Sequence, residues 1–160
     1  MKRIISIILS MILVMSLMAC SGSDTEEAIR DYLKNDLASL KELDVKIVNE
    51  INYAIENGEL RITARELMDM SIDFETNSRK LIDKLEDSEV KTVHGKHMGY
   101  SATMLLLSTE LVTYLDGRST AEDVDKLLAK AVEKCDEYNA ALSELLSKYD
   151  IDSAEYNLAQ

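Results

Sequence analysis

Apolar residues recur every three or four positions along nearly the whole chain from residue 24 onward, and this spacing is typical of helices that bury one face. The chain has no proline and only five glycines, so few residues interrupt a helix. Aromatic residues make up only 5% of the sequence, which disfavours a protein built from sheets and turns. We therefore predict an all-α fold.

Turn signals divide this pattern into four segments. In chain order they cover 24–57, about 63 to the break at 87–88, about 90–115, and 119 or 120 to 150. Three of them open on the spacing of a capping box, in which a Ser or Thr is followed three residues later by an acidic residue. These pairs are Ser23 with Glu26, Thr63 with Glu66, and Ser119 or Thr120 with Glu122 or Asp123. Gly58 is the expected left-handed stop of the first segment, and Asp116-Gly117-Arg118 ends the third.

The third segment is the least regular, because Gly95 and Gly99 lie inside its first half. Each glycine costs up to ~1 kcal/mol relative to alanine in a helix interior. We predict helix for 101–116, whereas the pattern does not choose between helix and loop for 90–100. The two glycines fit tight packing or a kink, and a hinge or a gap for a ligand is the alternative.

Four amphipathic helices with short connections have one economical arrangement, an up-down-up-down four-helix bundle. No helix can bury its apolar stripe alone, and short loops force neighbouring helices to be antiparallel. The alternative is an extended trimeric coiled coil, which the regular turn signals disfavour. The bundle is predicted over 24–150, and 151–160 forms a C-terminal tail that frays or lies against the end of the bundle.

The N-terminus carries a different pattern. Met1-Lys2-Arg3 precedes an apolar run from Ile4 to about Leu17, and small residues lead to a cysteine. This is the plan of a secretory signal, and the run is shorter than the ~20 residues that cross a bilayer. With Leu17-Met18-Ala19-Cys20 as its lipobox, the segment resembles the type II signal peptide of bacterial lipoproteins.

The resemblance implies that residues 1–19 are a cleaved signal peptide and that Cys20 carries fatty acyl chains such as palmitate. Residues 20–23 then form a lipidated tether, and the membrane is a partner through the lipid on Cys20. The domain would face outside the cytoplasm, on the cell membrane or the outer membrane. A plain transmembrane anchor and a non-lipidated secretory signal are the alternatives, disfavoured by the short apolar run and by the position of the cysteine.

The charge of the mature chain excludes several partners. Removal of Lys2 and Arg3 from the 18 basic residues leaves 16 against 30 acidic residues, a formal charge of −14. Nucleic acid needs basic surfaces, so we predict no nucleic-acid binding. The same charge disfavours a domain that lies flat on an anionic membrane. Acylation of Cys20 leaves Cys135 as the remaining thiol, so no intrachain disulfide is expected.

His94 and His97 are the only histidines, and their spacing places both imidazoles on one helix face. They are candidate ligands for copper, zinc or nickel, but the pattern lacks the third and fourth ligands of a typical site. The alternative is a hydrogen-bonded structural histidine in a helix seam. When residues at the same height along the four antiparallel helices are matched, a polar layer is predicted in the core, composed of Tyr32, Asn77, His97 and Asn139. We expect Cys135 to be a small buried apolar residue, and we predict no cofactor.

No motif for catalysis accompanies these residues, so we predict a protein that is not an enzyme. The expected function is binding or scaffolding at the cell envelope through a protein partner. About three residues join Cys20 to Ser23, a reach of roughly 10 Å, so the turns at 57–62 and 116–119 lie far from the membrane and would face that partner. The alternative function is a small-ligand or metal-binding module that uses His94 and His97.

Overall fold

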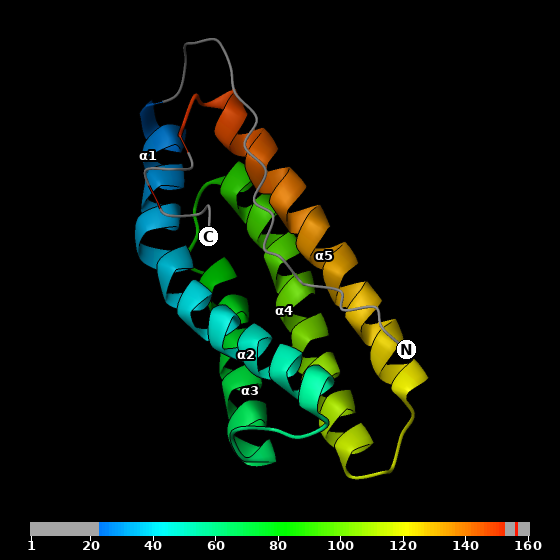
Figure 1. The fold of residues 1–160 in the computed structure, drawn as a ribbon. Helices are drawn as coiled ribbons and strands as arrows, with labels where there is room; N and C mark the ends of the chain where they lie inside the picture. The colour runs from blue at the N-terminus through cyan, green and yellow to red at the C-terminus, as the bar shows by residue number, and fades with distance from the viewer. Residues whose placement is uncertain (1–22, 153–155, 157–160) are drawn as a thin grey trace.

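The computed structural model describes residues 23–152 and 156, and over these residues the protein is all-α. Its elements in chain order are α1 (Ser23–Asp31), the π-helical turn η1 (Tyr32–Asp36), α2 (Leu37–Asn57), α3 (Ala64–Ile82), α4 (Ser88–Leu115) and α5 (Ala121–Lys148). Because α1, η1 and α2 follow one another without a break, they form the first helix of a bundle. Figure 1 shows this helix, α3, α4 and α5 alternating in direction, which confirms the predicted four-helix bundle.

The predicted starts of α3 and α5 and the predicted end of α2 are confirmed, whereas α3 ends at Ile82, before the predicted break at 87–88. Thr63 and Thr120 each accept a hydrogen bond from the backbone N–H three residues on, and the side chains of Glu66 and Asp123 accept from the cap residues in return. Gly58 follows α2 with φ of 74°, the left-handed conformation expected of a helix stop. The side chain of Ser23, predicted to cap the first helix, lies outside the described residues, as do residues 1–22 with the lipobox.

Helix α4 is longer than the sequence predicts. The Asp87 carboxylate accepts from the N–H groups of Glu89 and Val90 at 2.8 and 3.0 Å, so the helix begins at Ser88 and 90–100 are helical. A Cβ built on Gly95 would meet no atom within 4 Å, and one on Gly99 only the Lys134 side chain at 3.9 Å. Neither glycine is therefore required by a close approach of another backbone.

The core is formed by the predicted apolar stripes. Its largest fully buried side chains come from helix 1, α3 and α4: Ile29, Tyr32, Leu33, Leu40, Ile47, Ile51, Leu67, Phe74, His94, Met104, Leu107 and Leu111. Helix α5 adds buried residues that include Val124, Leu128, Ala131, Leu142 and Leu145. Ile55 is 44% exposed, because Ala54 occupies the inward position of that turn.

The π-helical turn at Tyr32–Asp36 is a feature that the sequence did not predict. A π turn accommodates one extra residue in a helix, so it rotates the residues on either side of it relative to each other. Two consecutive residues of this turn, Tyr32 and Leu33, are both buried. The Tyr32 hydroxyl lies 3.1 Å from His94 Nδ1 inside the bundle.

Polar contacts fasten the end of the bundle where α1 begins. They join Thr25 to Asp87, Lys148 and Tyr149 to Glu89, and Arg30 to Tyr156, at 2.7 to 3.0 Å. Ile151 is buried. Residues 151 and 156 of the predicted tail therefore lie against the bundle. None of the described helices is both long and apolar enough to cross a membrane.

Two glycine substitutions test this description of the helices. Gly95→Ala should raise the free energy of unfolding by about 0.5 to 1 kcal/mol, because the position is helical, exposed and open to a methyl group. Gly58→Ala should lower it by about 1 kcal/mol, because alanine is strained at φ of 74°. Urea unfolding followed by circular dichroism measures both. A destabilised Gly95→Ala variant would contradict the open, unkinked helix.

Candidate functional site

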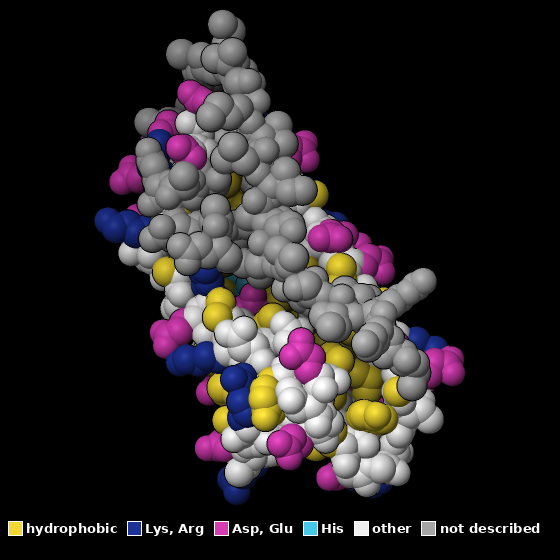
Figure 2. Space-filling view, viewed as in Figure 1, with side chains coloured by type: hydrophobic (Ala, Val, Ile, Leu, Met, Phe, Trp, Pro, Cys, Tyr) yellow, Lys and Arg dark blue, Asp and Glu magenta, His cyan; other side chains and the backbone are white. Residues whose placement is uncertain are grey.

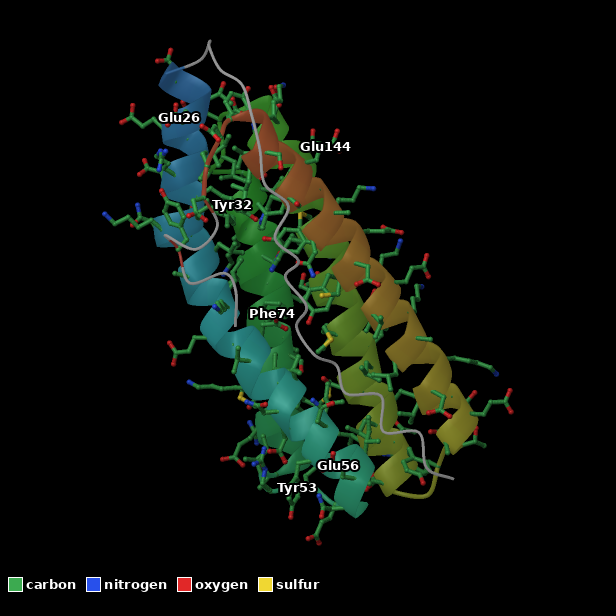
Figure 3. All side chains as sticks on the ribbon, turned by 45° about the horizontal axis from the view of Figure 1, so that its top comes forward. Glu26, Tyr32, Tyr53, Glu56, Phe74 and Glu144 are labelled. Atoms are coloured by element: carbon green, nitrogen blue, oxygen red, sulfur yellow. The ribbon has the colours of Figure 1, made fainter. Side chains whose placement is uncertain are left out.

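Both histidines lie inside the bundle, where His94 is 0% and His97 is 4% exposed. One turn apart on α4, their imidazole rings are nearly parallel, with centroids 5.3 Å apart and planes inclined by 12°. Figure 3 shows Tyr32 and Phe74 among the side chains that fill the space between the helices around them. The histidines are thus part of the packed interior.

His94 connects three parts of the bundle. Its Nε2 lies 2.7 Å from the backbone oxygen of Ser78 on α3, and its Nδ1 lies 3.1 Å from the hydroxyl of Tyr32 in η1. A carbonyl oxygen only accepts, so Nε2 carries the proton, and in the neutral ring Nδ1 accepts from the Tyr32 hydroxyl. Both ring nitrogens are therefore occupied, and a metal ion would have to displace one of these partners.

His97 is held by a hydroxyl and by aromatic edges. Its Nδ1 lies 2.8 Å from the Ser78 hydroxyl oxygen. Phe74, Tyr100 and Tyr138 meet its ring in edge-to-face geometry, with centroids 5.4, 6.2 and 5.0 Å away. Such contacts stabilise an aromatic cluster beyond the area that it buries.

The surroundings keep both imidazoles neutral at pH 7. Burial, and then the charge of the neighbouring His94, lower the pKa of His97 to about 3. Burial also lowers the pKa of His94, opposed by the bond to Ser78 and by the charge of Asp36. Among the described residues, no group of three or more His, Cys, Asp or Glu side chains is placed to hold a metal ion. The geometry thus favours the structural role of the histidines.

The buried polar layer differs from the predicted one. Tyr32 and His97 belong to it, but Asn77 is exposed and Asn139 is half-buried, with its amide 3.5 Å from Cys135 Sγ. The inward positions are taken by their chain neighbours Ser78 and Tyr138. One residue along a helix turns a side chain by about 100°, so an error of one position moves it out of the core.

A carboxylate that the sequence analysis missed lies beside this layer. The Tyr100 hydroxyl donates to Asp44 Oδ1 at 2.7 Å. Burial raises the pKa of Asp44 to about 6, although this hydrogen bond lowers it. Burial, and then the charge of Asp44, raise the pKa of Cys135 to about 11. The thiol is half-buried rather than fully buried as expected, and it is protonated at neutral pH.

A second candidate site is a groove on the outside of the bundle, between α2, the turn that follows it and α3. Its volume is about 550 Å³, and Ile62 and Met70 supply apolar lining. Its charged lining residues are Lys46, Glu50, Arg61, Glu66, Asp69 and Asp73. Figure 2 shows charged side chains of both signs over this end of the molecule.

Glu50 makes the closed side of the groove rigid. Its side chain is 4% exposed, and its carboxylate accepts from the backbone N–H groups of Arg61 and Ile62 at 2.5 and 3.4 Å and from Arg61 Nε at 3.0 Å. The Arg61 guanidinium also lies 4.6 Å from the centre of the Tyr53 ring. A buried carboxylate with this many donors is a structural anchor for the turn.

The open side of the groove is acidic. Both basic side chains of the lining are already paired, Lys46 with Glu42 at 2.7 Å and Arg61 with Glu50. On α3, Asp69 lies 3.7 Å from Arg65, whereas Asp73 has no ion pair or hydrogen bond within the part of the chain that the structure describes. The groove therefore offers uncompensated negative charge to a ligand.

Comparisons with protein-family models, with curated proteins and with solved structures find no match to this chain. The class that the structure defines is an all-α four-helix bundle, and its function has to be argued from its own residues.

The neutral histidines predict a specific pH dependence. The unfolded chain binds a proton at His97 below about pH 6.5, whereas the native state does so only near pH 3, so His97 weakens the fold as the pH falls. His97→Phe removes this effect. As the pH is lowered from about 6 to 4, the unfolding free energy of the variant minus that of the wild type should therefore increase by about 1.4 kcal/mol per pH unit.

Urea unfolding of both proteins at several pH values measures this difference. Asp44, with its raised pKa, acts in the opposite sense, since it weakens the fold as the pH rises through the same range. It is present in both proteins, so it cancels in the comparison. A constant difference between the two proteins across this range would contradict a buried neutral His97.

Proposed function

We propose that this protein is a lipid-anchored lipoprotein of the bacterial cell envelope whose helical bundle binds a partner outside the cytoplasm. The lipobox Leu17-Met18-Ala19-Cys20 supports the anchor. Cys20 lies three residues before the start of α1, so the lipid would hold the α1 end of the bundle within roughly 10 Å of the membrane. The turn between α2 and α3 is at the other end of this first helix (Figure 1).

The observation that carries the binding role is the groove at that far end. It is concave, it combines apolar lining with polar groups, and buried Glu50 keeps one side rigid, which are the properties of a preformed binding site. Its free negative charge selects a cationic ligand. We therefore take the partner to be a Lys- or Arg-containing segment of another envelope protein, which the formal charge of −14 would also attract at a distance.

The alternative, a metal- or ligand-binding module built on His94 and His97, gains no support from the geometry. His94 uses both of its ring nitrogens within the bundle, and His97 is fixed to Ser78. Catalysis by Cys135 is not supported either, because the active form of a cysteine nucleophile is the thiolate and its thiol has a pKa of about 11. We therefore do not propose either function.

The anchor is tested by Cys20→Ala. The variant should leave the membrane fraction, because it has no thiol to acylate, whereas Cys135→Ala removes the other cysteine and should remain membrane-bound. Detergent phase partitioning and immunoblotting of cell fractions measure the distribution. Equal membrane retention of Cys20→Ala and the wild type would show that the cysteine is not the anchor.

The groove is tested by the double variant Asp69→Asn and Asp73→Asn. Binding of a fluorescent Lys-rich peptide at physiological salt, followed by anisotropy, should weaken about fivefold, because two carboxylates of the acidic side are lost. The matched control Asp125→Asn and Glu133→Gln removes the same charge from exposed positions on α5 and should bind like the wild type. Equal weakening in both variants would mean that only the overall charge attracts the peptide.

A test in cells complements this measurement. A photoreactive residue at position 73 should give a discrete crosslinked product on intact cells, and the same residue at position 133 should not. A product from both positions, or from position 133 alone, would contradict the groove as the partner surface.

A further inference from the structure

Three helices bring four polar side chains together on the side of the bundle where α2 faces α5. Asp44 comes from α2, Tyr100 from α4, and Cys135 and Tyr138 from α5. The Tyr100 hydroxyl bonds to Asp44 directly. Burial raises the pKa of Cys135 and of Tyr138, and the charge of Asp44 contributes to both shifts. All four side chains therefore share the field of one carboxylate.

This carboxylate lacks a counterion. No Lys, Arg or His forms an ion pair with Asp44 among the described residues, and its only hydrogen bond there comes from the neutral Tyr100 hydroxyl to Oδ1. Oδ2 is left without a partner in the same part of the chain. A carboxylate that is partly removed from water is destabilised unless it is paired, so a bound cation would be favoured at this position.

A second polar group at the same place also lacks a full set of partners. The Tyr138 side chain is 5% exposed, and no group meets strict hydrogen-bonding geometry with its hydroxyl within the described residues. Its neighbour is Tyr32, whose charge and hydrogen-bond interaction add to the effect of burial in raising the pKa of Tyr138. Because that interaction uses the hydroxyl hydrogen, the Tyr138 oxygen still lacks a donor, and buried polar groups in native proteins are nearly always satisfied. A donor from a ligand would therefore be favoured at this oxygen.

Only part of this cluster is accessible from outside the bundle. Helix α5 packs on α4 and α2 packs on α3, whereas α2 and α5 are not closely packed on each other. Figures 1 and 3 both show α4 between them. Asp44 and Cys135 are half-buried, and Tyr100 and Tyr138 are buried behind them. The cluster thus lies at one side of the bundle and not at its centre.

We propose that Asp44, Tyr100 and Tyr138 bind the protonated primary amine of a small organic ligand. The ammonium pairs with Asp44 Oδ2, donates to the Tyr138 hydroxyl oxygen and lies against the tyrosine rings, which attract cations. A metal ion fits less well, because no group of three or more His, Cys, Asp or Glu side chains lies together among the described residues. The carboxylate repels an anion.

Calorimetric titration of the full chain in non-ionic detergent with n-propylammonium chloride tests the proposal, with sodium chloride at the same ionic strength as the blank. The wild type should show saturable binding of one ligand at pH 7.5. Asp44→Asn keeps the shape of the side chain, and Tyr138→Phe keeps the ring. Each should weaken binding, Asp44→Asn by about tenfold or more because a charged partner is lost.

Asp125→Asn is the matched control, since it removes an exposed carboxylate of α5 that belongs to neither site and should leave amine binding unchanged. Lowering the pH from 7.5 to 5 should weaken wild-type binding, because the pKa of Asp44 is about 6 and the carboxyl becomes neutral. No saturable heat, or equal binding by Asp44→Asn and the wild type, overturns the proposal. The groove residues take no part in this site. Absence of amine binding would therefore not contradict partner binding at the groove, and absence of partner binding at the groove would not contradict the amine site.

Discussion

The hydrogen bonds of His94 fix how three of the four helices of this bundle are placed relative to one another. Apolar stripes attract without direction, so two helices that differ by one turn in register bury similar areas. A buried hydrogen bond is directional, and it is costly to leave unmade. His94 on α4 bonds to the Tyr32 hydroxyl in η1 and to the Ser78 backbone oxygen on α3. A slip of any of these three elements would leave buried polar groups unsatisfied. The π turn belongs to the same constraint, because it carries Tyr32.

Because His94 is used to hold the bundle together, its ring is not free to bind a ligand. An imidazole that holds a carbonyl on one nitrogen and a hydroxyl on the other is not free to ligate or to transfer protons. Among the described residues, the polar groups without a full set of partners include the Asp44 carboxylate and the Tyr138 hydroxyl on one side of the bundle, Asp73 in the outer groove and the Ser119 hydroxyl before α5. The polar groups that secure the fold and those that remain open to a ligand are thus different residues on the same helices.

Much of the fold could be predicted from the sequence because it follows from local rules. Thr63, Thr120 and Gly58 act as helix ends through contacts within a few residues, and the apolar stripes follow from the helical repeat. The buried polar residues were harder to place, because a search for apolar spacing passes over them. Asp44 lies between Leu40 and Ile47 at alternating steps of four and three, and Ser78 lies in the same way between Phe74 and Leu81. Asn77, three residues after Phe74 and four before Leu81, fits the helical repeat equally well, so spacing alone does not choose between it and Ser78. No local signal in the sequence marks the π turn at Tyr32–Asp36.

Electrostatics then connects the fold to the proposed anchor. The first described turns of helix 1 carry Asp24, Glu26, Glu27 and Asp31, with Arg30 as their basic neighbour. An anionic membrane surface repels such an end, while a short tether at Cys20 would keep it close. A bundle that stands away from the membrane, with the groove at its outer end, satisfies both the repulsion of the acidic end and the short tether. A helix of about 35 residues at 1.5 Å per residue would hold that groove roughly 50 Å from the tether, which is beyond several Debye lengths at physiological salt. The acidic groove would therefore meet a cationic partner without competition from the charge of the membrane itself.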